Sequence, residues 1–253
     1  MTRLALALAA LAALATPLAS ARAADPVVKP EAQRPTVAIL YFDYSGKDES
    51  LGVLKKGLAQ MVITDLSGLT AVRIVERERL QEILDELKLG TSAKIDPATA
   101  AKVGKLLGAR YMVMGGYFDL LGSLRVDARV VEVETGRIIR SVGAIGKGDD
   151  FLELERKIAV ELEKILTSDA ISATPPARSG QVDPTPPPKP GATPTPPPAR
   201  PKQLRTKTAL KWARALDAID RGNKEEATAT LTQVVAEQPD FALAQGELTR
   251  LMR

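Results

Sequence analysis

Residues 37–42 read Val-Ala-Ile-Leu-Tyr-Phe, an unbroken apolar run that begins two residues after Pro35. A continuous run of this kind predicts a strand buried on both faces of a sheet. Around it, apolar runs alternate with segments of helical periodicity from residue 36 to about residue 168, in the predicted order β-α-β-α-α-β-β-β-α. This order predicts an α/β fold over residues 36–168, with a mixed sheet flanked by helices.

Local signals set the predicted boundaries. Asp96-Pro97 combines an N-cap residue with proline at the first helical position, and the helix that it opens should end at Gly108. Thr135-Gly136 fits a tight turn between two strands, and Asp149 or Asp150 should cap the last helix of the domain. The predicted strands besides 37–42 span 72–75, 110–119, 124–134 and 137–146.

The composition excludes several classes of enzyme. The 253 residues include no cysteine and no histidine, which rules out disulfides, thiolate nucleophiles, Ser-His-Asp catalysis and zinc held by His or Cys. The formal charge is +4, but six basic residues fall in the proline-rich stretch 173–209, opposed only by Asp183. A folded basic face is not indicated, so no nucleic-acid partner is expected.

The first 23 residues have the pattern of a secretory signal. Arg3 provides the positive start, residues 4–15 the apolar core, and Ala21-Arg22-Ala23 the cleavage site. An uncleaved anchor is the alternative, although Pro17 interrupts the apolar run. We expect an exported, periplasmic protein with no transmembrane segment in the mature chain and, without a cysteine to acylate, no lipid anchor.

Residues 169–206 are predicted to be a disordered linker, because the stretch 173–206 holds twelve of the chain's eighteen prolines. An extended segment of this length would span on the order of 100 Å at ~3.1 Å per residue. A proline-rich recognition ligand is the alternative interpretation. Residues 207–253 regain helical periodicity and form a second, small all-α unit.

Four segments resemble the CsgG family and the related TolB N-terminal-like domains. They are Val37–Asp43 with the following Ser45-Gly46 turn, Val75-Glu76-Arg77-Glu78-Arg79-Leu80, the stretch 106–115 that begins Leu-Leu-Gly-Ala, and the stretch 126–136 that ends Glu-Thr-Gly. The resemblance covers residues 36–168 and implies a soluble periplasmic domain of an envelope or curli-type assembly component. The connection 120–123 is only a short turn, so pore formation is not expected.

The C-terminal unit resembles a tetratricopeptide repeat. Gly222, Ala227, Leu231 and Pro239 have the spacing of that repeat, and residues 241–251 would add a capping helix. A single repeat usually needs neighbours to bury its face, so contact with a partner or another copy is expected. The predicted protein-interaction residues are Trp212, Leu216, Ile219, Ala227 and Leu231.

Other motifs indicate no chemistry. The glycine-rich stretch 143–148 lacks the spacing of a P-loop and is interpreted as a turn. The acidic run of Glu76, Glu78, Glu82, Asp85 and Glu86 alternates with basic residues, which is typical of a solvated helix face with ion pairs. No catalytic, cofactor-binding or metal-binding residue is predicted, and no cofactor.

The leading hypothesis is a non-enzymatic envelope assembly or scaffold protein with a tethered helical interaction unit, whose partners are envelope proteins or copies of itself. The alternative is a periplasmic module that binds a small ligand or peptidoglycan, with the crevice near residues 43–47 as its site, since open α/β sheets often bind ligands at strand ends. A carboxylate-dependent hydrolase is a third hypothesis with no motif behind it.

Overall fold

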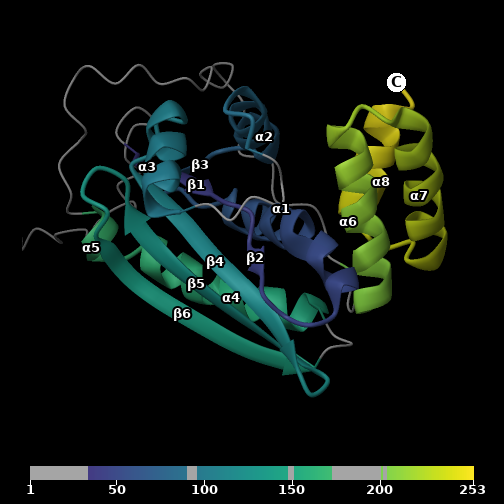
Figure 1. Cartoon of the computed structure of the whole chain (residues 1–253), viewed down its shortest axis with the longest axis horizontal. Helices are drawn as coiled ribbons and strands as arrows, with labels where there is room; N and C mark the ends of the chain where they lie inside the picture. Colours follow the sequence, from purple (N-terminus) through teal and green to yellow (C-terminus); the bar gives the residue numbers. More distant parts are fainter. Residues whose placement is uncertain (1–33, 90–95, 148–150, 173–200, 202–203) are drawn as a thin grey trace, which may run out of the picture.

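The computed structural model describes residues 34–89, 96–147, 151–172, 201 and 204–253. The predicted signal peptide, most of the proline-rich linker and the predicted cap at Asp149 or Asp150 lie outside these residues. Figure 1 shows an α/β part in which helices pack on a twisted sheet, and an all-helical part beside it. The predicted fold class is confirmed.

The sheet is mixed and has the strand order β3-β1-β4-β5-β6, with the short β2 also paired to β4. Strands β1, β3 and β2 run parallel to their neighbours, whereas β4, β5 and β6 form an antiparallel meander. The strands are β1 (Thr36–Ile39), β2 (Asp43–Tyr44), β3 (Arg73–Ile74), β4 (Tyr111–Leu120), β5 (Ser123–Glu132) and β6 (Ile138–Lys147).

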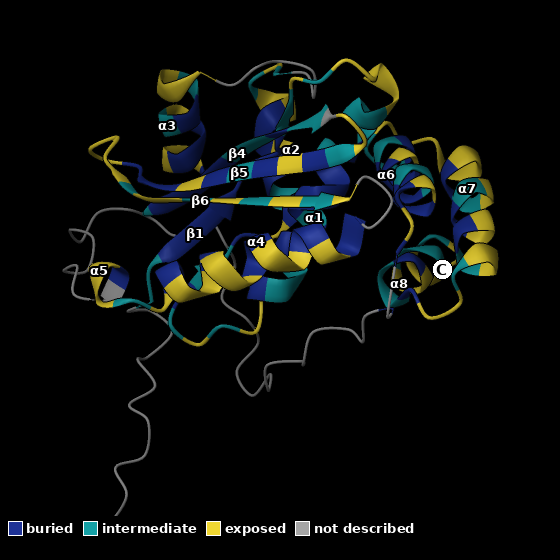
Figure 2. Ribbon diagram, turned by 90° about the horizontal axis from the view of Figure 1, so that it is seen from below, coloured by how far each residue is buried: buried dark blue, intermediate teal, exposed yellow. Residues whose placement is uncertain are grey.

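The helices of the α/β part follow the predicted order. They are the 3-10 helix η2 (Glu49–Val53), α1 (Leu54–Leu66), α2 (Arg77–Glu86), α3 (Pro97–Leu106), α4 (Phe151–Leu166) and the short α5 (Asp169–Ser172). Figure 2 shows α1 and α4 on one side of the sheet and α3 on the other. The outer part of the sheet beyond α3, formed by β5 and β6, has an exposed face.

Sequence signals explain the boundaries. All six residues of the run 37–42 are buried, as predicted, but the strand β1 ends at Ile39, so residues 40–42 lie outside it. Asp96 caps α3 by accepting hydrogen bonds from the backbone N–H groups of Ala98 and Thr99, at 2.9 and 3.1 Å. Between β4 and β5, Leu121 and Gly122 both have positive φ, at 50° and 80°, which makes the tight two-residue hairpin that right-handed strand twist favours.

The C-terminal unit consists of α6 (Thr206–Asp220), α7 (Lys224–Glu237) and α8 (Ala242–Leu251). Its core includes an edge-to-face pair of Trp212 and Phe241, with ring centroids 5.0 Å apart. Gly222, at φ +73°, and the N-cap Asn223 make the turn from α6 to α7. We call α6–α8 the helical module; its identity as a tetratricopeptide repeat stays a prediction.

The helical module does not stand apart from the α/β domain in this structure. Helix α6 packs on α1 and η2 (Figure 1). The expected arrangement, in which a spacer holds the module away from the domain, therefore differs from what is observed. The reason lies in complementary packing and charge at one surface, described next.

Candidate functional site: a buried ion cluster under the helical module

Helix α6 can approach α1 closely because α1 carries a glycine at the contact. A Cβ atom on Gly57 would lie 3.2 Å from the Cβ of Ala213 and 3.3 Å from the indole ring of Trp212. The absent side chain leaves room for the indole, which is completely buried. This apolar contact forms one part of the interface between domain and module.

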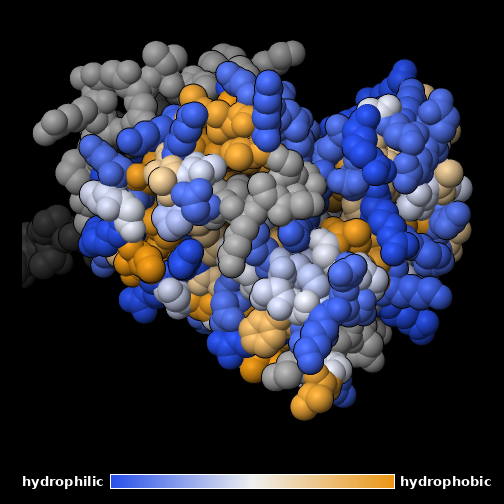
Figure 3. Space-filling view, in the orientation of Figure 1, coloured by the Kyte–Doolittle hydropathy of each residue, from blue (hydrophilic) through white to orange (hydrophobic). Residues whose placement is uncertain are grey.

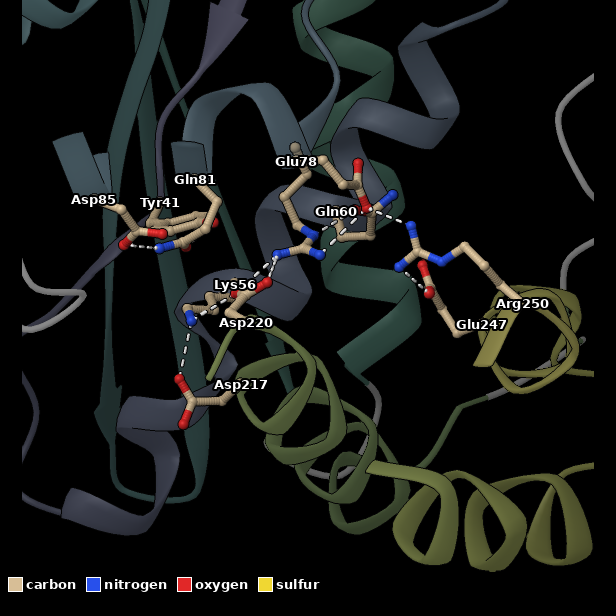
Figure 4. A network of polar contacts seen from close by, with 11 residues as sticks. Tyr41, Lys56, Gln60, Glu78, Gln81, Asp85, Asp217, Asp220, Glu247 and Arg250 are labelled. Carbon is tan, nitrogen blue, oxygen red and sulfur yellow. Dashed lines mark hydrogen bonds and ion pairs between the residues drawn. The ribbon is translucent and has the colours of Figure 1, made fainter. Parts of the chain in front are cut away.

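The other part is a cluster of buried charges drawn in Figure 4. Arg77, the first residue of α2, has a side chain that is only 1% exposed. Its Nη1 atom donates hydrogen bonds to both carboxylate oxygens of Asp220 on α6, at 2.7 and 2.9 Å, and its Nε atom donates to Oε1 of Gln60 at 3.0 Å. The arginine thus links α2, α1 and the last turn of α6.

Lys56 of α1 provides the second cation. Its side chain is 5% exposed, and its Nζ atom lies 2.7 Å from Oδ2 of Asp220 and 2.9 Å from Oδ1 of Asp217. The ammonium group also lies 5.8 Å from the ring centroid of Tyr41, which favours the cation further. We call Lys56, Arg77, Asp217 and Asp220 the docking cluster; both cations belong to the α/β domain and both carboxylates to the module.

A more exposed ion pair extends the cluster toward α8. Glu78 lies 3.3 Å from Arg77 and 3.4 Å from Arg250, which also pairs with Glu247 at 2.6 Å. On the other flank, the hydroxyl of Tyr41 donates to Gln81 at 2.7 Å. The ion pairs therefore run from Lys56 on α1 to Arg250 on α8, and the Tyr41–Gln81 hydrogen bond lies beside them (Figure 4).

Because the charges of the docking cluster are buried, each of them depends on its partners. Burial opposes the charge of Arg77, but the adjacent Asp220 and Tyr41 favour it, and the balance raises the pKa of Arg77 above its ordinary value. A buried ion pair adds little net stability compared with apolar packing, but removal of one partner leaves an uncompensated charge. The cluster therefore disfavours any arrangement of the module that would leave one of these charges buried without a partner.

Four of the five predicted interaction residues are fully buried within the chain itself. They are Trp212, Leu216, Ala227 and Leu231, while Ile219 is partly buried. Of these, the structure shows Trp212 at the contact with α1. A role for these side chains in binding a partner stays a prediction, and it requires that the module leave its present position or present another face.

The prediction for the acidic run holds only in part. Arg79 and Glu82 form an exposed ion pair at 2.8 Å, as expected for a solvated helix face. Arg77 departs from that expectation, because Asp220 lies 143 residues further along the chain and buries it. Neither Lys56 nor Arg77 has a sequence signal that distinguishes it from surface charges, and sequence reasoning missed both.

A second feature is a groove of about 920 Å³ over the exposed part of the sheet. Asp43, Tyr44 and Ser45 line it, as the alternative hypothesis for residues 43–47 expects, together with Asp127 and Arg129 of β5. The backbone N–H of Lys47, from the same loop, donates to Asp119 at 3.2 Å. The groove is therefore bordered by the predicted crevice but lies mainly along β4–β6.

The lining of this groove includes a carboxylate between two glycines. Gly116 on β4 and Gly143 on β6 are the cross-strand neighbours of Asp127. Arg125 holds the Asp127 carboxylate through two hydrogen bonds of 2.8 and 2.7 Å. Figure 3 shows polar and apolar side chains mixed over the face of the molecule seen in Figure 1.

Two kinds of feature are missing from the part of the chain that the structure describes. Residues 34–89, 96–147, 151–172, 201 and 204–253 contain no group of three or more Asp or Glu side chains placed to hold a metal ion. Within the same ranges, no helix is long and apolar enough to cross a membrane.

Comparison with known proteins identifies part of the α/β domain. Residues 24–120 match the family model of the curli production assembly/transport component CsgG. The match covers less than half of the chain and includes three of the four segments on which the predicted resemblance rests; the fourth, 126–136, lies beyond it. A search of curated proteins finds no match to this chain.

Several solved structures are similar to this chain at low identity. Lipoprotein GNA1162 from Neisseria meningitidis is 13% identical, with a TM-score of 0.40, and the match covers 53% of this chain and 97% of that one. LpoB from Escherichia coli is 12% identical, with a TM-score of 0.38 and coverages of 56% and 83%. A PelC variant from Paraburkholderia phytofirmans, solved as a dodecamer, is 16% identical, with a TM-score of 0.36 and coverages of 54% and 91%.

The glycine contact leads to a prediction about docking. Gly57→Leu should push α6 away from α1, because even a Cβ atom there is in close contact with α6. We expect a loss of about 1–3 kcal/mol in the free energy of unfolding and a red shift in the emission of Trp212, the chain's single tryptophan. Gly246→Leu on α8 is the matched control, because nothing lies within 4 Å of its added Cβ. Unchanged emission in Gly57→Leu would contradict the contact.

Proposed function

We propose that this chain is a non-enzymatic assembly or scaffold protein of the cell envelope, exported to the periplasm, in which the helical module is the protein-interaction element. The docking cluster is the observation that carries the proposal. The match of residues 24–120 to the CsgG model supports the envelope setting. The signal-like pattern of residues 1–23 supports export.

The docking cluster supports an interaction role because of its chemistry. The core of a protein–protein interface is usually depleted of charged residues, whereas this one places four charged side chains between domain and module. Ionic contacts choose a partner by charge and position rather than by apolar area. A module held in this way can be docked selectively and also released.

The test of this proposal compares the mature chain with Asp220→Asn, in which the module is expected to be released. Both proteins are measured by size-exclusion chromatography with light scattering and are cross-linked in envelope extract. We expect specific cross-linked envelope partners or defined oligomers, with a different set or amount in the variant. A strictly monomeric protein that captures nothing in either form would refute the proposal.

The groove supports a second candidate function, the binding of a small ligand or of peptidoglycan. The carboxylate of Asp127 and the exposed guanidinium of Arg129, which both line it, suit a polar glycan or a peptide carboxylate. The volume of the groove, about 920 Å³, falls within the range found for small-molecule sites.

If the groove binds peptidoglycan, Arg129→Ala should weaken co-sedimentation with purified sacculi by about tenfold or more, the effect of losing a charge-assisted hydrogen bond. The control is Arg140→Ala, an exposed arginine on β6 that does not line the groove. Equal binding by wild type and both variants, or no sedimentation at all, would remove this candidate.

A further inference from the structure

The docking cluster is divided by charge along the boundary between domain and module. Lys56 and Arg77 come from α1 and α2, and Asp217 and Asp220 come from α6. The domain therefore presents a carboxylate-binding site, and α6 presents its ligand. Such a site makes the same contacts with carboxylates of its own chain and with those of a second chain.

The module has contacts of its own that do not depend on the domain. Trp212 packs edge-to-face on Phe241, and Leu231 and Val234 of α7 are completely buried. One side of Trp212 faces Gly57 of the domain, while the other faces α8. The three helices can therefore move as one body that carries the carboxylates with it.

The sequence between domain and module allows that movement. Helix α5 ends at Ser172 and α6 begins at Thr206, and the segment between them holds twelve prolines. The 33 residues between these two helices set an upper limit on the order of 100 Å for the distance between Ser172 and Thr206. The length of the chain therefore does not prevent α6 from reaching a site on a neighbouring molecule.

From these observations we propose that the helical module exchanges between copies of this chain. Asp217 and Asp220 of one copy bind Lys56 and Arg77 of a second copy, and Trp212 of the first lies on Gly57 of the second. The interface is the one seen here, formed between chains. This inference rests on the proposed function, since it names the partner of the module as a second copy of the same chain.

Competition within one chain decides when the exchange occurs. A tether keeps the chain's own module at an effective concentration of the order of mM or below, so dilute protein is mostly docked within one chain. When the local concentration of other copies reaches this effective concentration, docking between chains becomes as favourable as docking within one chain. Exchange of an identical element is a low-barrier route to oligomers because no new contact has to be designed.

The absence of cysteine from the chain provides a direct test. A Cβ on Gly57 would lie 3.2 Å from the Cβ of Ala213, slightly less than the ~3.5–4.5 Å found in disulfides, so a shift of α6 by a few tenths of an ångström brings the two positions within the disulfide range. Full-length Gly57→Cys and Ala213→Cys proteins are mixed at high concentration with oxidised glutathione. Mixed disulfides are identified by mass on non-reducing gels. The double variant Gly57→Cys/Ala213→Cys in one chain verifies the geometry by closing an internal disulfide.

The expected result is a mixed disulfide in clear excess over either homodimer, reduced about tenfold or more when Asp220→Asn is added to the Ala213→Cys chain. An internal disulfide in the double variant without any mixed disulfide overturns the exchange. A mixed disulfide that is insensitive to Asp220→Asn overturns the role of the docking cluster. Failure of the double variant to close overturns the contact itself. Cross-linking to a different envelope protein would leave the proposed function intact in each of these cases.

Discussion

Asp220→Asn should lower the free energy of unfolding by about 3–5 kcal/mol, the usual effect of removing one partner from a buried ion pair. Asp220 contacts both Arg77 and Lys56, and its own side chain is only 8% exposed. Without the carboxylate, two buried cations lose their common partner. We expect the module to undock, so that Trp212 emission shifts to the red before the α/β domain unfolds in urea.

The matched control is Asp217→Asn. Asp217 contacts only Lys56 within the docking cluster, and its side chain is 35% exposed. Solvent screens such a pair, so the expected loss is about 1 kcal/mol or less. Equal losses for the two variants would show that Asp220 is not the centre of the cluster. A triple variant with Met at 56 and 77 and Leu at 220 should recover stability, because apolar packing replaces a buried ionic group well.

Between pH 5 and pH 8 the wild-type protein should become less stable, and Glu155→Gln should remove most of that change. Glu155 lies on α4 and is completely buried. Burial raises the pKa of this carboxyl to about 8, against an ordinary value of 4.5. The protonated form is therefore favoured in the folded chain, while the unfolded chain ionises freely.

The sign of the pH dependence follows from linkage. Below pH 4.5 both states hold the proton, and Glu155 does not penalise folding. As the pH rises toward 8, only the unfolded state releases the proton, so folding loses stability, by about 4 kcal/mol for a shift of this size. Urea titrations at several pH values measure the slope. Glu163→Gln, at an exposed position of α4, should leave the slope unchanged. If the stability of Glu155→Gln changed with pH as steeply as that of the wild type, Glu155 would not be the cause of the pH dependence.

Local signals are sufficient for most of the α/β domain. The buried strand at 37–42, the cap at Asp96-Pro97 and the turn at Gly136 each depend on the conformational preferences of a few neighbouring residues. The cap and the turn occur at the expected places, whereas the strand β1 ends at Ile39 and residues 40–42 are buried without being part of it. The three antiparallel strands β4, β5 and β6 agree with prediction within about two residues at each end.

The docking cluster shows why the candidate site could not be found in the same way. Arg77 stands in a run of alternating charges, where helical spacing indicates a solvated face. Its burial depends on Asp220, which is distant in sequence and belongs to another structural unit. The sequence shows which residues are cations, but it does not show which of them will be buried by a carboxylate that is distant along the chain.

The groove could be predicted from the sequence only in part. The end of the first strand predicts a crevice at residues 43–47, and Asp43, Tyr44 and Ser45 do line the groove. Part of its lining, however, depends on the register that places Gly116 and Gly143 beside Asp127. Register between strands is a property of the folded sheet and has no marker in any one strand.

The amino-acid sequence alone determined the α/β class, the order of its elements, the all-helical C-terminal segment and the lack of histidine and cysteine chemistry, because these depend on composition and on short-range periodicity. Only the tertiary structure decided that the helical module packs on α1 and that Lys56 and Arg77 become a carboxylate-binding site. The physical reason is that burial of a charge depends on which distant surface excludes water from it, and that surface exists only after the chain has folded.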